Sequence, residues 1–111
     1  MVTKGSNIVK ASVTNGYGQG FVLEEIEIAE PIGAEVLAEV KASGLCRSDL
    51  SIQEDGLGIY ELPAVLGHEA AGEVIAVGPD VTAFSVGDHV VGCLVQMCGR
   101  CANCLTGLGT L

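Results

Sequence analysis

Three cysteines within seven residues carry the clearest chemistry in this sequence. Cys98, Cys101 and Cys104 recur at every third position, with small or polar residues between them. Short Cys-x-x-Cys spacings let neighbouring thiolates converge on one Zn²⁺, and glycine permits the tight backbone that this requires. A closed structural zinc site has four ligands, so the segment supplies three of them. A chance cluster of buried cysteines is the less favoured interpretation.

A second set of possible ligands precedes the cluster. Cys46, Ser48 and Asp49 place a thiol, a hydroxyl and a carboxylate within four residues, and His68 and Glu69 follow as neighbours. A free cysteine is often only a small buried side chain. A single histidine is more often structural than a ligand. The residue types alone therefore leave both a structural and a catalytic interpretation open.

The fifth cysteine, Cys93, lies five residues before Cys98. We expect it to be a buried packing residue, with a role as the fourth zinc ligand as the alternative. The sequence shows no signal peptide near its start and no apolar run long enough to cross a membrane. These features favour a reducing cytoplasm, where clustered cysteines bind metal instead of forming disulfides.

Composition limits the fold and the partners. The chain has 111 residues, which suits one domain. Hydrophobic residues make up 49 % but aromatic residues only 4 %, so the core must be aliphatic, and 16 glycines indicate many turns. The net charge of −9 argues against nucleic acid and anionic membrane surfaces as partners.

The elements that must position these residues are mostly short strands. Apolar residues alternate with polar ones between turn signals, the pattern of an antiparallel barrel or sandwich. Val36, Ala38 and Val40 are expected on one face of their strand. A glycine-rich stretch at 16–20 reads as a hairpin loop, because its glycines do not match a dinucleotide-binding fingerprint. Ser48 or Asp49 is expected to cap a short helix that runs toward residue 53. The predicted strands are 8–13, 21–28, 35–42, 71–77 and 90–91.

Taken together, the motifs resemble the N-terminal part of the zinc-dependent alcohol dehydrogenases of the medium-chain dehydrogenase/reductase family. The resemblance extends from about residue 24 to residue 111. It rests on four motifs that occur in the family's order: 44–49, 67–72, 77–90 and 98–104. It implies a mainly β, GroES-like fold, a partly open barrel of short antiparallel strands with one short helix and a projecting zinc-knuckle lobe.

The resemblance also implies roles for single residues. Cys46 and His68 match two ligands of a catalytic zinc, and Glu69 matches a carboxylate that can approach that metal. Ser48 matches the hydroxyl that carries the alcohol proton away, and Asp49 the carboxylate that orients the ligand histidine. The remaining matches are Arg47 with a contact to the cofactor pyrophosphate, and Cys98, Cys101 and Cys104 with three ligands of the structural zinc.

The sequence departs from the family pattern at several points. Ser51 stands where many relatives have a histidine that ends the proton path. The fourth structural cysteine would be residue 112, and the third catalytic zinc ligand would come much later. No Gly-x-Gly-x-x-Gly follows a predicted strand, so the nucleotide-binding domain is not represented.

We therefore expect residues 1–111 to form one incomplete GroES-like domain of an alcohol dehydrogenase. The full-length enzyme would use Zn²⁺ and NAD or NADP to oxidise a primary or aromatic alcohol to an aldehyde, whereas the isolated chain would be inactive and would expose apolar surface. Its partners would be a small-molecule alcohol or aldehyde, with homo-oligomerisation possible. The alternative is a standalone zinc-binding or GroES-like assembly module without catalysis.

Overall fold

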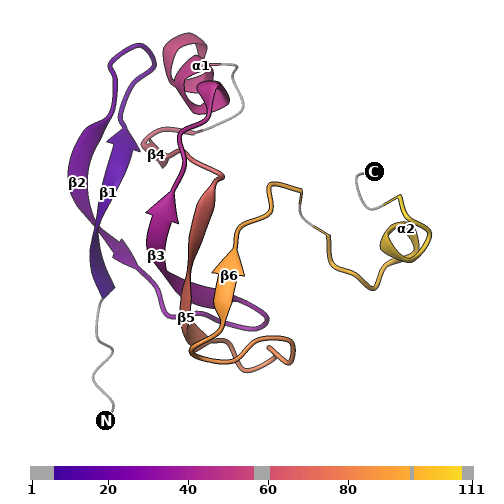
Figure 1. Ribbon diagram of the computed structural model, residues 1–111. Helices are drawn as coiled ribbons and strands as arrows, with labels where there is room; N and C mark the ends of the chain where they lie inside the picture. The colour runs from indigo at the N-terminus through magenta and orange to yellow at the C-terminus, as the bar shows by residue number, and fades with distance from the viewer. Residues whose placement is uncertain (1–6, 57–60, 96, 109–111) are drawn as a thin grey trace.

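The computed structural model describes residues 7–56, 61–95 and 97–108. It consists of two three-stranded antiparallel sheets, a helix at one end of the molecule beside β4 and a small lobe at the C-terminal side (Figure 1). The first sheet has the strand order β2-β1-β4, and the second has the order β3-β5-β6. The elements are β1 (Asn7–Thr14), β2 (Val22–Ile28), β3 (Val36–Ser43), α1 (Arg47–Asp55), β4 (Ala64–Val65), β5 (Ala70–Val77), β6 (His89–Val91) and α2 (Ala102–Leu105).

The first sheet is built on a hairpin. β1 pairs with β2 from Asn7 opposite Ile28 to Val13 opposite Val22, and the glycine-rich loop joins the two strands. Glutamates and isoleucines alternate along β2, as a half-buried strand requires. The short strand β4 adds to the other side of β1, only at the end of that strand.

The second sheet pairs β3 with β5 along nearly their whole length. The pairing runs from Val36 opposite Val77 to Ser43 opposite Ala70, with two irregularities that bend the ladder. β6 pairs with the first half of β5. Gly72 lies where the backbone of β3 passes closely, so a side chain at this position would collide with the carbonyl of Glu39.

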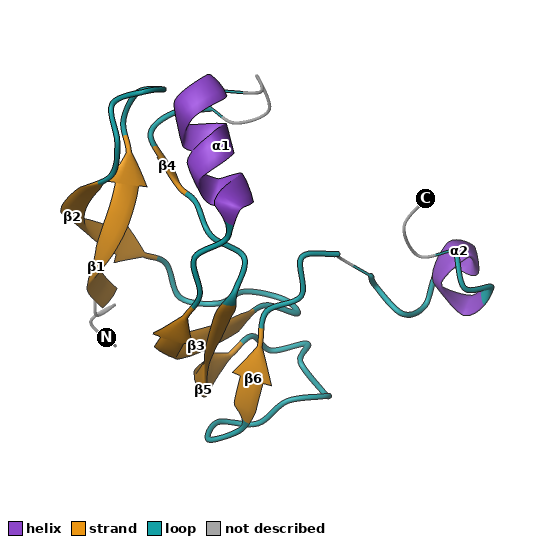
Figure 2. Ribbon diagram, turned by 45° about the horizontal axis from the view of Figure 1, so that its top comes forward, coloured by secondary structure: helices purple, strands orange, loops and turns teal. Residues whose placement is uncertain are grey.

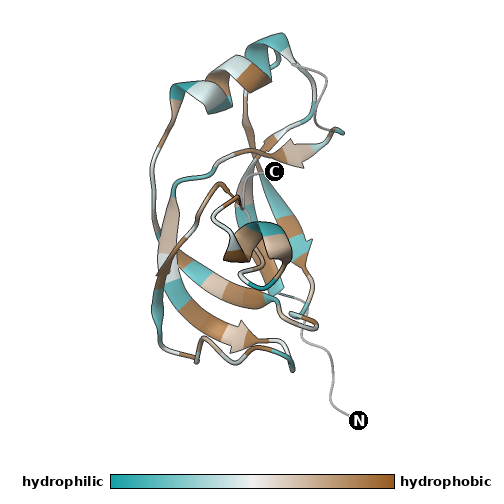
Figure 3. Ribbon diagram, turned by 90° about the vertical axis from the view of Figure 1, so that its right-hand side faces the viewer, coloured by the Kyte–Doolittle hydropathy of each residue, from teal (hydrophilic) through white to brown (hydrophobic). Residues whose placement is uncertain are grey.

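Few apolar side chains of the described residues are fully buried. Val13 is 4 % exposed and Val74 is 0 % exposed, whereas Leu45 and Val91 are 94 % and 75 % exposed. Hydrophobic and hydrophilic residues alternate along the ribbons (Figure 3), and the large apolar strand residues Ile8, Leu23 and Val40 are each more than half exposed. The expectation of exposed apolar surface is confirmed.

The structure confirms the predicted fold class and the predicted strands within one or two residues. The two-residue strand β4 was not predicted, because it has no alternating pattern of its own and forms by pairing with β1. The helix α2 was also missed. No helix among the described residues is long and apolar enough to cross a membrane.

One detail of the helix prediction was wrong. The N-cap of α1 is Cys46, not Ser48 or Asp49, and the helix ends at Gly56 in the left-handed conformation. The reason is local: the Asp49 carboxylate, at the third helical position, accepts a hydrogen bond from the backbone N–H of Cys46 at 3.2 Å.

Candidate functional site

The two segments with candidate ligands lie where the chain leaves the second sheet and where it returns to it. Cys46 lies in the connection from β3 to α1, and His68 lies in the connection from β4 to β5 (Figure 2). The paired ends of β3 and β5 hold these connections together, and the N–H of Gly44 donates to the carbonyl of Glu69 at 2.8 Å. Residues more than twenty positions apart in the sequence thus meet at one junction.

At this junction, the Cys46 thiol, the His68 imidazole and the Glu69 carboxylate each place one ligand atom within 4.8 Å of the others. His68 Nε2 lies 3.9 Å from Glu69 Oε1. Thiolate, imidazole and carboxylate are the three ligand types that proteins offer to zinc. This donor set fits Zn²⁺, and we call it the junction site.

Asp49 connects the two ligand segments through its two carboxylate oxygens. Oδ2 accepts from the backbone N–H of Cys46 at 3.2 Å, and Oδ1 lies 3.2 Å from Nδ1 of His68. The side chain is 8 % exposed, so little water competes for these contacts. A proton on Nδ1 that points at a carboxylate leaves Nε2 with its lone pair free for a ligand.

The hydroxyl of Ser48 donates to the Cys46 thiol at 3.1 Å, and its side chain is exposed. Arg47 is exposed in the first turn of α1, where backbone N–H groups point away from the helix and favour anions. Ser51 lies on the same helix and is half-buried. The Ser48 hydroxyl and the Asp49 carboxylate therefore both reach the junction from the first turn of one helix.

The neighbouring groups shift the acidity of both principal ligands. The hydrogen bond from the Ser48 hydroxyl, followed by the Ser48 backbone N–H and His68, lowers the pKa of the Cys46 thiol. Partial burial lowers the pKa of His68, but the Cys46 thiol and the Asp49 carboxylate raise it more, so its net shift is upward. A thiolate beside an imidazole is the form that binds a metal cation.

Gly44 makes room for Glu69. A Cβ at this position would collide with the carboxylate and Cβ of Glu69. The glycine therefore lets the Glu69 side chain lie over the backbone of the β3–α1 connection, at the edge of the junction site. Glycine is thus required at position 44 for a steric reason, which the residue types of the motif alone did not reveal.

The three-cysteine segment forms a second, separate cluster, which we call the knuckle (residues 98–108). Cys98 Sγ lies 3.8 Å from Cys104 Sγ, and Cys101 Sγ lies 3.5 Å from Cys104 Sγ. Two thiolates on a tetrahedral zinc with Zn–S bonds of 2.3 Å are about 3.8 Å apart, so these separations fit one metal. Figure 1 shows the knuckle, with α2, standing apart from both sheets.

The knuckle stabilises a thiolate from its own backbone. The N–H groups of Arg100 and Cys101 hydrogen-bond the Cys98 sulfur, and with the neighbouring thiols they lower the pKa of Cys98 to about 7. The N–H of Cys101 lies 3.3 Å from this sulfur. The groups that lower this pKa all belong to the knuckle itself.

The expectation that Cys93 packs in the core was wrong. Its side chain is exposed, and its thiol donates to the carbonyl of Val95 at 3.4 Å. It is also not a member of the Cys98, Cys101 and Cys104 cluster. Cysteine is small and only weakly polar, so its residue type does not predict whether it is buried or exposed in the connection between β6 and the knuckle.

Sequence reasoning also missed the contact of Asp49 with the Cys46 backbone. The signal was available in the spacing. In a capping box, the side chain three residues after the N-cap accepts a hydrogen bond from the N-cap backbone N–H, and Asp49 lies three residues after Cys46. The same carboxylate was expected near His68 from the resemblance. Its two oxygens serve both contacts at once.

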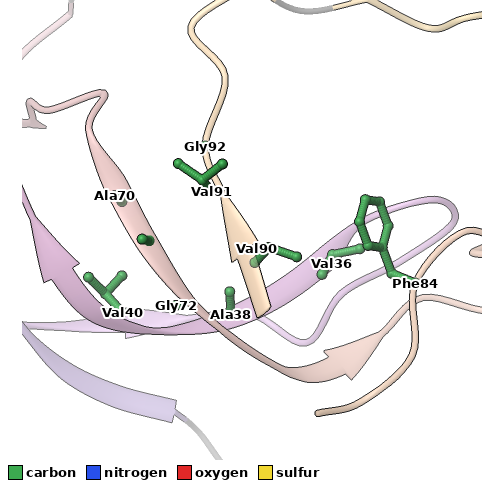
Figure 4. Close-up of a pocket in the computed structure, with 10 residues that line it drawn as sticks. Val36, Ala38, Val40, Ala70, Gly72, Phe84, Val90, Val91 and Gly92 are labelled. Atoms are coloured by element: carbon green, nitrogen blue, oxygen red, sulfur yellow. The ribbon is translucent and has the colours of Figure 1, made fainter. Parts of the chain in front are cut away.

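An apolar cavity of about 250 Å³ lies over the second sheet (Figure 4). Val36, Ala38 and Val40 of β3 share this face as predicted, together with Val90 of β6 and Phe84 of the β5–β6 connection. The residues that line it include no thiol, imidazole or carboxylate. It is an open apolar pocket, because Val40 and Val91 of its lining are exposed, and its lining offers no second chemical site.

Comparison with known proteins agrees with this geometry. The family model of the alcohol dehydrogenase GroES-like domain matches residues 33–111. An NDMA-dependent alcohol dehydrogenase of Amycolatopsis methanolica is 43 % identical over 102 residues, which are 92 % of this chain and 27 % of that enzyme. The chain therefore spans just over a quarter of the length of this relative.

Solved structures give the same result. An alcohol dehydrogenase zinc-binding domain protein from Burkholderia ambifaria matches with a TM-score of 0.85 and 46 % identity, over 95 % of this chain and 28 % of that one. Benzyl alcohol dehydrogenase from Acinetobacter calcoaceticus matches with a TM-score of 0.81 and 43 % identity, over 90 % and 27 %. This chain therefore belongs to the alcohol dehydrogenase GroES-like domain family and corresponds to the N-terminal domain of its relatives.

Proposed function

We propose that this chain is the N-terminal catalytic domain of a zinc-dependent alcohol dehydrogenase that oxidises a primary or aromatic alcohol to an aldehyde with NAD or NADP. One observation supports this most directly: Cys46, His68 and Glu69 converge at one junction, with Asp49 behind the histidine. The aromatic substrate class is supported by the similarity to a benzyl alcohol dehydrogenase.

In this proposal, Cys46 and His68 hold a catalytic zinc, and Glu69 lies close enough to approach it. Zinc with an open coordination position supplies Lewis acidity, which favours loss of the alcohol's proton. Asp49 holds the proton on Nδ1 of His68, so that Nε2 keeps its lone pair toward the site. The remaining ligand would come from a later part of the full-length enzyme, beyond residue 111.

The exposed residues of the first helical turn handle the proton and the cofactor. Ser48, whose hydroxyl lies beside the Cys46 sulfur and near solvent, takes up the alcohol proton and passes it to water. A histidine is not available for this step at position 51, where this chain has a serine. Arg47, at the N-terminus of α1, binds the cofactor pyrophosphate by charge and by the helix dipole.

Cys98, Cys101 and Cys104 hold a structural zinc, with a fourth ligand from outside the described residues. The chain's place as one incomplete domain is supported by its coverage of about a quarter of its relatives and by its exposed apolar side chains. Clustered free thiols favour a reducing cytoplasm. The alternative of a ring-forming assembly module has no use for the junction site.

Cobalt binding tests the proposal. Co²⁺ replaces Zn²⁺ and gives absorption bands that report thiolate and imidazole ligands. The wild-type chain is expected to bind Co²⁺ at two sites. Cys46→Ser removes only the first site, and Cys98→Ser removes only the second. A Cys46→Ser chain that retains both sets of bands would remove Cys46 from the ligands and with it the proposed catalytic zinc.

Activity provides the second test. Residues 1–111 by themselves should form no NADH from benzyl alcohol and NAD, because they correspond to about a quarter of their relatives and contain no dinucleotide-binding fingerprint. Alcohol-dependent NADH formation by the pure chain, lost in Cys46→Ser, would contradict the proposed incompleteness.

A further inference from the structure

Helix α1 turns two polar side chains inward. Asp49 is 6 % exposed and Gln53 is 3 % exposed, and they are the buried residues of this helix. Four positions apart, they lie on the same face, one turn from each other. Asp49 contacts His68, whereas the proposed function assigns nothing to Gln53. A buried amide must have hydrogen-bond partners, so the partners of Gln53 show what holds this end of the helix.

The partners are three consecutive backbone N–H groups of the glycine-rich loop. We assign the Gln53 amide with its oxygen toward the loop, because its NH₂ group would otherwise face three N–H donors in exchange for one long contact of 3.5 Å to the Gly16 carbonyl. The oxygen then accepts from the N–H groups of Gly18 at 3.2 Å, Gln19 at 3.0 Å and Gly20 at 2.6 Å. Successive N–H groups that converge in this way form a nest for an oxygen atom. The loop thus uses its donors to hold the helix.

Further contacts fix the same loop and helix. The N–H of Gly18 also donates to the backbone carbonyl of Gln53 at 2.7 Å. At the helix C-terminus, Gly56 has a φ of +78°, and the Tyr17 ring occupies the space that a Cβ would need. The hydroxyl of Thr14, which is fully buried, donates to the carbonyl of Gly20 at 3.1 Å. The loop is therefore anchored to the end of β1.

The strand that leads to His68 has the same anchor. β4 pairs with β1 only at Val13 and Thr14, and the chain continues from β4 to His68. The helix with Asp49 and the strand before His68 are consequently both attached to the last two residues of β1. Gln53 makes the attachment on the helix side. Its loss would let α1 turn or tilt relative to His68 while the paired ends of β3 and β5 stay in place.

We propose that Gln53 is a positioning residue for the junction site. Its amide oxygen, held by the N–H groups of Gly18, Gln19 and Gly20, fixes the rotation of α1 and so keeps the Asp49 carboxylate against Nδ1 of His68. The effect of this positioning on metal binding rests on the proposed function, in which His68 is a zinc ligand. The positioning itself is a property of the metal-free chain and can be measured without metal.

The first measurement is the tautomer of the His68 ring. In the wild-type chain, Asp49 Oδ1 beside Nδ1 holds the proton on that nitrogen, and ¹⁵N chemical shifts of the ring at alkaline pH report it. Gln53→Met keeps the length of the side chain but removes the amide oxygen, so the Gly20 N–H loses this acceptor, whereas the N–H groups of Gly18 and Gln19 keep the backbone carbonyls of Gln53 and Gly16. We expect the ratio of Nδ1–H to Nε2–H forms to fall about fivefold, as for the loss of one ordinary hydrogen bond. Gln53→Glu retains an acceptor and should restore the wild-type ratio.

A matched control separates positioning from stability. Val74→Ala removes buried volume in β5, distant in sequence from the loop and helix, and destabilises the fold without touching the Gln53 contacts. Its tautomer ratio should equal that of the wild type even if its melting temperature falls as far as that of Gln53→Met. Equal ratios in Gln53→Met and wild type, or equal losses in Gln53→Met and Val74→Ala, would overturn the proposal. So would a wild-type ring that carries its proton on Nε2.

The second measurement is Co²⁺ affinity at the junction site, in the chain with Cys98→Ser. Loss of a residue that orients a metal ligand lowers metal affinity by about 10-fold or more. We therefore expect Gln53→Met to lower the Co²⁺ affinity about 10-fold and Gln53→Glu to lower it less than about twofold. Absence of Co²⁺ binding by the wild-type junction site would contradict the proposed function, and the tautomer ratio would still decide the role of Gln53. An unchanged affinity in Gln53→Met together with a changed tautomer would likewise overturn the link to metal binding.

Discussion

The junction site and the knuckle offer similar ligands but are assembled in different ways. The knuckle collects its three thiols from seven consecutive residues, and its hydrogen bonds include Leu105 N–H to the Cys101 carbonyl and Leu108 N–H to the Asn103 carbonyl. The junction site joins Cys46 to His68 across a helix and a short strand. The first needs a local backbone turn, whereas the second needs both sheets.

This difference has a consequence for stability. Forming the knuckle orders few residues, and a bound metal can supply the free energy for that ordering. Forming the junction site requires the closure of a long loop and the burial of Asp49 and Gln53, which the fold must support by itself. The described part of the fold buries few apolar side chains, so we expect the junction site to be the more fragile of the two.

The largest effect should come from a charge in the core. Val74 is fully buried in β5, and Val74→Asp places an unpaired carboxylate there. The cost of about 4 kcal/mol is a large part of a small domain's stability, so the sheets should unfold. Co²⁺ absorption should then show loss of the junction site and retention of the knuckle within about twofold, since the knuckle's ligands are local. Joint loss of both sites would show that the knuckle also depends on the sheets.

A smaller effect should separate the two sites without unfolding. Asp49→Asn keeps the size of the side chain and removes its charge. We expect the Co²⁺ affinity of the junction site to fall by roughly 10- to 100-fold, because the carboxylate no longer fixes the His68 ring. The pKa of His68 should fall, because the Asp49 carboxylate raises it. Binding at the knuckle serves as the internal control, and an equal loss there would indicate general destabilisation.

The smallest effect concerns pH. The pKa of Cys98 is lowered from 9.0 to about 7 by N–H groups of its own segment. Because the folded pKa is the lower one, the thiolate stabilises the knuckle conformation fully above pH 9, and this contribution is lost as the pH falls through about 7. In the metal-free chain, the rate of Cys98 alkylation by iodoacetamide should rise with a midpoint near this value.

The Val74→Asp chain sharpens this test. If the donors to the Cys98 sulfur are local, the alkylation midpoint should be the same in the unfolded-sheet variant as in the wild type. A midpoint that returns to that of an ordinary thiol would mean that the sheets, and not Arg100 and Cys101, set the acidity of Cys98. Peptide mapping by mass spectrometry assigns the modified cysteine.

Much of this molecule could be predicted from local patterns. The alternation in 22–28, the turn signals around the strands and the spacing of Cys98, Cys101 and Cys104 all act over a few residues, so the residue types suffice. The same is true of the helix after Cys46, although its N-cap was misplaced by two or three positions. The resemblance placed Cys46, His68 and Glu69 in one site before any geometry was available.

The tertiary structure alone decided how that site is held. Two oxygens of Asp49 serve Cys46 and His68 together, Gly44 leaves space for Glu69, and Gln53 occupies the nest of the glycine-rich loop. The tertiary structure also places Cys93 at the surface, whereas the sequence suggested that it would be buried. The physical reason is range: propensity and spacing act between near neighbours, whereas these contacts join segments that only the pairing of β1 with β4 and of β3 with β5 brings together.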